Sequence, residues 1–122
     1  QELASYLTQI DLTDAERSWA LGMRAQLMID REAFSQAQSL LDEAAKLTVG
    51  ADAQLQGELA YRQGYAAWRL GQLDAAERFM RVARAQLGIR NPLDAEAAYA
   101  LGKIHQSRGQ TPEAISFFED II

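Results

Sequence analysis

The segment that decides the fold is GYAAWRLGQLDAAERF, residues 64–79, which holds the middle of one helix, a glycine stop and the start of a second helix. The segment GKIHQSRGQTPEAISF, residues 102–117, follows the same plan further along the chain. The two segments share Gly64 and Gly102, Gly71 and Gly109, Ala76 and Ala114, and Phe79 and Phe117 at equivalent positions. Since small side chains let helix axes approach, this pattern predicts closely packed antiparallel helices.

The composition predicts an all-α protein. The chain has 122 residues, which suits a single domain, and its 48% hydrophobic and 24% charged residues are typical of a sequence that folds. Ala, Leu, Gln, Glu and Arg dominate, and all five favour helices. No run of β-branched residues indicates a strand. No apolar run approaches the roughly 20 residues of a membrane span, so we expect no membrane insertion.

Charge and cysteine usage narrow the possible functions. The formal net charge is −5, whereas a nucleic-acid-binding protein normally carries a basic stripe that neutralises phosphates. Acidic residues alternate with the arginines in the middle of the chain, so we expect solvated helix faces there and no nucleic-acid partner. The sequence has no cysteine, which excludes disulfides and leaves the compartment undetermined. The chain starts without Met and stops inside a predicted helix, so we expect a fragment of a larger protein.

Capping signals predict about seven helices. Residues 1–9 are interpreted as the end of an earlier helix, and the other predicted helices cover residues 13–30, 35–47, 52–70, 74–87, 91–108 and 111–122. Capping boxes, in which two side chains satisfy the first backbone N–H groups, are predicted at Thr13-Glu16, Ser35-Gln38 and Asp74-Glu77. Two cap residues precede a proline, in Asn91-Pro92 and Thr111-Pro112. Four glycines are predicted to end helices: Gly50, Gly71, Gly88 and Gly109.

Two of these helices show an apolar pattern of their own. In residues 13–30 the large apolar positions approximate helical spacing and comprise Trp19, Leu21, Met23, Leu27 and Met28. In residues 35–47 a clear stripe comprises Ala37, Leu40, Leu41, Ala44 and Leu47. Each stripe is predicted to face a neighbouring helix.

The helix pairs align with one another along the chain. Ala37, Ala76 and Ala114 match at nearly equal intervals. A large apolar residue follows four positions later in each case, as Leu41, Met80 and Phe118, and the next matching set is Ala44, Ala83 and Ile121. A helix pair that recurs with such a regular period predicts a helical solenoid.

The repeats resemble the tetratricopeptide repeat family from about residue 18 to residue 122. One unit matches its small-residue and aromatic positions with Gly64, Gly71, Ala76, Met80 and Ala83, and the next with Leu101-Gly102, Gly109, Ala114 and Phe118. The first unit is weaker and offers Ala25, Glu32, Phe34, Ala37, Leu41 and Ala44. The period, such as the step from Ala76 to Ala114, is longer than the family's usual one of about 34 residues. The family's Trp near the start of the first helix is replaced here by Ala60 and Ala98. The family's Tyr before the turn is replaced by Ala67 and His105.

The resemblance implies a right-handed superhelical solenoid whose units cover residues 13–51, 52–90 and 91–122, with residues 1–12 ending a preceding helix. The first helix of each pair would line a concave groove that binds a peptide or helix of another protein. The binding residues would be Tyr61, Arg62, Tyr65, Trp68, Arg69, Tyr99 and Lys103, and the same face would display Gln26, Asp30 and Glu96. The competing interpretation is that the aromatic residues only fill the space between repeats.

The sequence contains no constellation that indicates catalysis, a metal or a cofactor. His105 is the only histidine, and neither neighbouring turn supplies a partner for it. The glycines are spaced as helix stops and not as a phosphate-binding loop. The positions at which some tetratricopeptide proteins clamp a terminal carboxylate hold Glu58, Arg62, Glu96 and Ala100, of which only Arg62 suits that role. We therefore expect a non-catalytic interaction or scaffold module, in the style of repeats from bacterial regulators and signalling proteins.

The final helix leaves two alternatives open. It is strongly apolar, with Ala114, Ile115, Phe117, Phe118, Ile121 and Ile122. A solenoid normally ends in a helix with a polar outer face. Either a further helix covers this one, or the chain forms a homodimer through it and serves as a self-association module. A further alternative is a regulatory sensor arm in a signalling or transcription protein.

Overall fold

The computed structural model describes residues 11–122, and within them it contains six α-helices and no strand. The helices are α2 (Asp14–Asp30), α3 (Phe34–Lys46), α4 (Ala53–Arg69), α5 (Leu73–Leu87), α6 (Pro92–Ser107) and α7 (Thr111–Glu119). The all-α prediction is confirmed. The helix predicted over residues 1–9 lies outside the described residues. Among the described helices, none is both long and apolar enough to cross a membrane.

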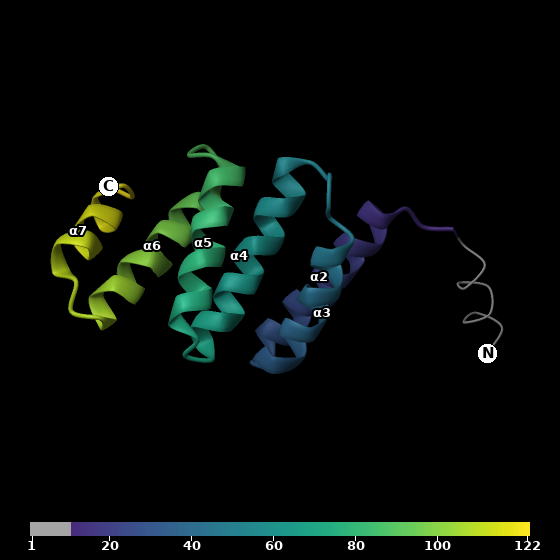
Figure 1. Cartoon of the computed structure of the whole chain (residues 1–122), viewed down its shortest axis with the longest axis horizontal. Helices are drawn as coiled ribbons and strands as arrows, with labels where there is room; N and C mark the ends of the chain where they lie inside the picture. Colours follow the sequence, from purple (N-terminus) through teal and green to yellow (C-terminus); the bar gives the residue numbers. More distant parts are fainter. Residues whose placement is uncertain (1–10) are drawn as a thin grey trace.

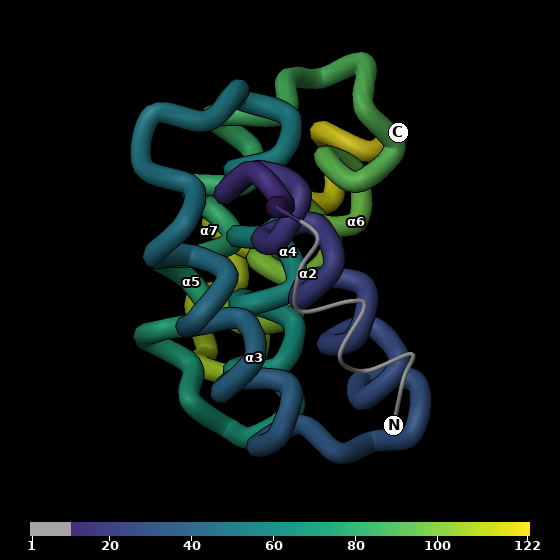
Figure 2. Tube along the Cα trace, turned by 90° about the vertical axis from the view of Figure 1, so that its right-hand side faces the viewer, coloured from purple at the N-terminus to yellow at the C-terminus, as the bar shows by residue number. Residues whose placement is uncertain are grey.

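The six helices form an elongated array in chain order, with α2 and α7 at opposite ends (Figure 1). α2, α4 and α6 begin at Asp14, Ala53 and Pro92, so successive first helices start at equal intervals along the chain. A view along the array shows α2, α4 and α6 on one side and α3, α5 and α7 on the other (Figure 2). We name these sides the first-helix layer (α2, α4, α6) and the second-helix layer (α3, α5, α7).

The turn inside each pair is three residues long and has one repeated conformation. The middle residue has a positive φ in all three turns, 59° at Glu32, 78° at Gly71 and 74° at Gly109. The following N–H donates to a carbonyl five residues back, from Ala33, Gln72 and Gln110 at 2.7, 2.8 and 2.9 Å respectively. This Schellman arrangement satisfies free carbonyls at the helix end and reverses the chain tightly. The predicted stop at Gly71 and Gly109 is therefore confirmed, and Glu32 adopts the same conformation without being glycine.

Side chains cap the start of each first helix, at Thr13 and Asn91 as predicted and at Asp52, where the predicted helix begins. Thr13 and Glu16 form the capping box of α2, and the side chains of Asp52 and Asn91 accept from backbone N–H groups of α4 and α6. These three cap residues have extended backbone, with ψ from 131° to 161°. That conformation brings a side-chain oxygen within reach of the first free N–H groups of the helix. Gly88 also ends α5 as predicted, with φ of 80°.

The predicted caps are wrong at the start of each second helix. α3, α5 and α7 begin directly after the tight turn, so Ser35, Asp74 and Thr111 already lie inside the first helical turn. The actual cap residues are Ala33, Gln72 and Gln110, which have ψ of 66° to 72° and make no side-chain cap bond. The Schellman hydrogen bond fixes the backbone of these residues outside the extended conformation that a side-chain cap needs. Gly50 is likewise in a later turn, because α3 ends at Lys46.

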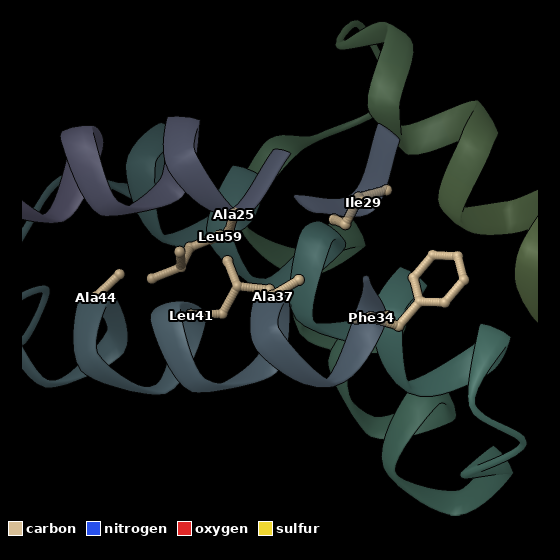
Figure 3. Packing of buried hydrophobic residues seen from close by; sticks show 8 residues of the cluster. Ala25, Ile29, Phe34, Ala37, Leu41, Ala44 and Leu59 are labelled. Atoms are coloured by element: carbon tan, nitrogen blue, oxygen red, sulfur yellow. The ribbon is translucent and has the colours of Figure 1, made fainter. Parts of the chain in front are cut away.

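Small residues of the first helices meet large residues of the second helices. A Cβ atom built on Gly64 would lie 3.1 Å from atoms of Met80, and one built on Gly102 would lie 2.7 Å from Cζ of Phe118. In the first unit, Ala25 and Leu41 belong to one buried cluster (Figure 3). The three pairs share one separation along the sequence, so they are equivalent contacts of successive units. As the second-helix residue grows from Leu to Met or Phe, the first-helix residue shrinks from Ala to Gly.

The apolar stripe predicted for α2 is correct only in part, since Leu21 and Met28 pack against a buried cluster without being buried themselves. The buried residues of that helix are Ser18, Gly22, Ala25 and Ile29, whereas Trp19 is 56% exposed and Leu27 is 53% exposed. The buried Ser18 hydroxyl donates to the carbonyl of Ala44 at 3.1 Å, so this polar side chain joins α2 to α3. Close approach of neighbouring helices selects small side chains at the crossing, and Trp19 and Leu27 are left exposed. The stripe of α3 is confirmed, with Ala37, Leu41 and Ala44 buried.

Ion pairs reinforce the contact between the second and third units. Arg84 of α5 pairs with Asp94 of α6 at 3.0 Å and with Asp120 after α7 at 3.1 Å. Arg108, in the turn after α6, pairs with Glu77 of α5. A hydrogen bond from Arg108 and a weaker one from Arg81 lower the pKa of Glu77 below its ordinary value, and burial acts in the opposite direction. These contacts fix the position of α6 against α5.

Candidate functional site

A pocket of about 410 Å³ opens on the first-helix layer, where α2, α4 and α6 meet. Its lining comes from three helices and one turn: Gln26, Ile29 and Asp30 of α2, Glu32 of the first turn, Tyr61, Arg62, Tyr65 and Arg69 of α4, and Glu96 of α6. The pocket is therefore bounded by all three units. Four of its nine lining residues carry aromatic rings or guanidinium groups, and all four lie on α4.

Helical spacing brings one wall of the pocket together. Tyr61, Tyr65 and Arg69 are four residues apart, so they lie on one face of α4. The rings of Tyr61 and Tyr65 have centroids 6.3 Å apart and are inclined by 30°. Arg69 donates to the Tyr65 hydroxyl at 3.0 Å, and its guanidinium lies 4.8 Å above the ring of Phe34. The result is an aromatic wall whose outer end is held by an arginine.

Arg62 places a partly buried positive charge in the pocket. Its Nε donates to the Oε1 of Gln26 at 3.2 Å, which is a neutral acceptor. Within residues 11–122, Arg62 makes no ion pair with a carboxylate. Burial lowers the pKa of Arg62 below its ordinary value, opposed by nearby Glu58. A partly buried guanidinium without a directly paired carboxylate favours an anionic group beside it.

The phenol of Tyr61 is the second buried polar group of the pocket. Burial raises its pKa to about 12, and the negative charge of Glu96 and the neighbouring Tyr65 act in the same direction. The phenol therefore stays protonated at neutral pH. A protonated phenol next to a guanidinium can donate a hydrogen bond to the same oxygen that Arg62 attracts.

The rim of the pocket carries negative charge. Asp30, Glu32 and Glu96 are exposed, and Glu32 approaches Arg69 only at 3.9 Å. Exposed pairs of this kind contribute little to stability and leave both charges accessible to another molecule. The electrostatic pattern is thus a positive interior at Arg62 with carboxylates at the edges.

The structure brings together four of the seven predicted binding residues. Tyr61, Arg62, Tyr65 and Arg69 line the pocket, and so do Gln26, Asp30 and Glu96, which were expected on the same face. Ile29 and Glu32 also line it without having been predicted. Glu32 holds the same position in its turn as Gly71 and Gly109, and this equivalence is the signal that could have placed it near Arg69.

The other three predicted residues lie elsewhere. Trp68 packs on the buried clusters between α4, α5 and α6, with its ring edge-on to Tyr65 at 6.0 Å. Tyr99 is 48% exposed and approaches Phe118, with ring centroids 6.0 Å apart. Lys103 is partly buried and does not line the pocket. For Trp68 the competing interpretation of core packing describes its surroundings better.

The His105 side chain is held in place by neighbouring side chains. Its Nδ1 lies 2.6 Å from Oε1 of Gln110, and its ring stacks on Phe117 with centroids 5.3 Å apart. Its Nε2 lies 3.4 Å from a carboxylate oxygen of Glu77. Among residues 11–122 no group of three or more His, Asp or Glu side chains is arranged to hold a metal ion.

The pocket chemistry suits recognition of a molecule that is both apolar and charged. The aromatic wall offers contact area, Arg62 and Tyr61 offer donors, and the rim offers acceptors. Neither a protein-family model nor a curated protein sequence matches the chain.

Proposed function

We propose that the chain is a tetratricopeptide-like domain, a right-handed solenoid of three helix pairs. The three identical turns and the in-phase pairs of small and large residues support this assignment. So does the packing between layers, because the backbone of α4 closely approaches those of α2 and α6, whereas among the described helices the backbones of α3 and α5, and of α5 and α7, do not approach one another as closely. Helices that approach one another more closely lie on the inner side of a curved array. The first-helix layer would then be concave, and the pocket would lie within it.

The function that the pocket supports best is non-catalytic binding of a protein segment. The observation that carries this proposal is Arg62, a partly buried guanidinium without a carboxylate partner among the described residues, next to the Tyr61–Tyr65 wall. An extended peptide or a helix could place an acidic side chain at Arg62 and an apolar side chain on the tyrosines. A pocket of about 410 Å³ is large enough for such side chains. Basic residues of the partner that flank the acidic one would face Asp30 and Glu96.

The lining itself favours binding over catalysis. As far as the structure describes it, the lining contains no histidine, serine or lysine, so the common pairing of a serine or lysine nucleophile with a histidine base is missing there. Aromatic residues and arginines are the types that dominate protein recognition energetics. We infer that Arg62 supplies specificity and that the tyrosines supply most of the contact energy.

Selection from a phage-displayed library of random peptides tests this proposal. We expect the enriched peptides to combine an acidic residue with an aromatic or aliphatic one. Their binding should weaken by at least about tenfold in Arg62→Gln, since charge-assisted hydrogen bonds contribute about 1.5–3 kcal/mol. Arg78→Gln is the matched control, because Arg78 is exposed on α5 in the other layer. Equal binding to the two variants, or a selection without enrichment, would contradict the proposal.

A further inference from the structure

The two ends of the array expose apolar side chains. At the α7 end, Tyr99 is 48% exposed and Ile121 is 41% exposed, and Phe118 is only partly buried. At the α2 end, Leu27 is 53% exposed, and Ala20 and Met23 are partly buried. A hollow of about 410 Å³ lies beside Ala20, bordered by Leu21 and Leu47.

The exposed residues at the α7 end repeat a set that is covered inside the array. α6 packs on a surface formed by Tyr61 of α4 and by Met80 and Ala83 of α5. The equivalent residues of the next unit are Tyr99, Phe118 and Ile121. The α7 end therefore presents the same kind of receiving surface that accepts α6, with larger apolar side chains.

The exposed residues at the α2 end repeat the opposite half of that contact. α6 inserts Ala97, Ala100 and Ile104 toward the preceding pair, and all three are buried. The equivalent residues of the first unit are Ala20, Met23 and Leu27. The α2 end therefore presents the same kind of inserting surface as α6.

We propose that a second copy of this chain binds head-to-tail. In this contact, α2 of one copy packs on α6 and α7 of the other copy, in the same way that α6 packs on α4 and α5 within one chain. The internal contact between units supports this occupant, because its two halves are exposed at the two ends. Charge agrees with it at one point. Arg24 stands where α6 has Leu101, so its aliphatic stem would lie on Phe118 while its guanidinium reaches Glu119 of α7, a helix without a basic residue.

A head-to-tail contact uses different surfaces on the two partners, so it extends into longer assemblies instead of stopping at a dimer. It also leaves the pocket residues free, since none of Tyr61, Arg62 and Arg69 lies at either end. The association is therefore independent of the peptide-binding function proposed above.

Sedimentation velocity and light scattering of the chain and two end variants test the proposal. For the wild type we expect an average mass that rises with concentration from the 13.5 kDa monomer past the dimer. Leu27→Glu removes the α2 end and Ile121→Glu removes the α7 end, so each variant alone should stay monomeric. Their equimolar mixture should form a dimer and nothing larger, because each variant keeps the end that the other lacks. Val49→Glu, at a position 90% exposed between α3 and α4, should associate like the wild type.

Three results would overturn the proposal. One is a wild-type mass that stays monomeric up to about 1 mM, the weak end of measurable association. Another is a dimer that survives Leu27→Glu but not Ile121→Glu, which would show a symmetric contact between two α7 ends. The third is a variant mixture that stays monomeric. Circular dichroism checks the fold, and Leu27→Gln or Ile121→Gln replaces any variant that loses helix content.

Discussion

Gly102 offers the sharpest test of why small residues recur in the array. A Cβ atom there would lie 2.7 Å from Cζ and 2.8 Å from Cδ1 of Phe118. The ring cannot retreat freely, since it also approaches Tyr99 with centroids 6.0 Å apart. Overpacking of this kind costs about 1–3 kcal/mol, while alanine gains about 1 kcal/mol over glycine inside a helix. We therefore expect Gly102→Ala to lower the free energy of unfolding by about 1 kcal/mol.

A second substitution should rescue the first. Phe118→Leu in the Gly102→Ala background recreates the Ala25–Leu41 pair of the first unit, which is packed in a buried cluster. Phe118→Leu alone leaves a void beside glycine and should cost about 1 kcal/mol. The double variant should be close to the wild type in stability, so the coupling between the two positions should amount to about 2 kcal/mol.

Urea unfolding in dilute solution, followed by circular dichroism, measures these free energies. Gly22→Ala is the matched control in α2, because its Cβ would lie 3.6 Å from Nη1 of Arg62 and 3.9 Å from Cδ1 of Leu59, which are ordinary contacts. It should stabilise the protein by about 1 kcal/mol through helix propensity alone. If Gly102→Ala is stabilised to the same extent, then the close approach of Phe118 does not constrain this position and the steric reasoning is refuted.

Three further predictions concern stability and pH. Glu32→Gly should stabilise the protein by about 1 kcal/mol, because Glu32 is held at φ of 59°; an unchanged melting temperature would count against it. Because its pKa in the folded state is raised to about 12, Tyr61 destabilises the folded state as pH rises from about 10, where free tyrosine ionises, to about 12. Tyr61→Phe should remove its share of that decline in urea midpoints measured across this pH range. Arg108 lowers the pKa of Glu77, so ionised Glu77 stabilises the folded state fully above the ordinary carboxyl pKa. This stabilisation is lost as pH falls through the lowered pKa. Glu77→Gln should therefore reduce the fall of the urea midpoint at acidic pH.

The array could be read from the sequence where a rule depends only on neighbours along the chain. Asp52 and Asn91 follow connections long enough for extended backbone, and their side chains cap the next helix. Thr13 caps α2 as predicted. Gly71 and Gly109 end helices because their positive φ is cheap for glycine. The alanines that align from one second helix to the next are all buried.

Other features depended on contacts that no local pattern reveals. Ser35 and Asp74 have the residue types of caps, but the turn before them places the helix start one or two residues earlier. In α2 the largest apolar residues were taken for the buried stripe, yet Trp19 and Leu27 are exposed, while the small Ser18 contacts α3 and Gly22 faces α4. Trp68 is seven residues after Tyr61, so both lie on nearly the same side of α4, but the two turns between them place Trp68 beside the clusters shared with α5 and α6 and away from the pocket.

The pocket arises from positions at which the units differ, whereas the array arises from positions at which they agree. Gly22 of α2 is equivalent to Tyr61 of α4, and Gln26 is equivalent to Tyr65. A tyrosine in place of Gly22 would fill the space now held by the guanidinium of Arg62, whose Nη1 lies 3.6 Å from where a Cβ would stand. A small residue on α2 opposite an arginine on α4 therefore makes room for Arg62 in the pocket. The residues that recur in every unit form the helix crossings. The residues that recognise a partner must therefore be those that differ from one helix pair to the next.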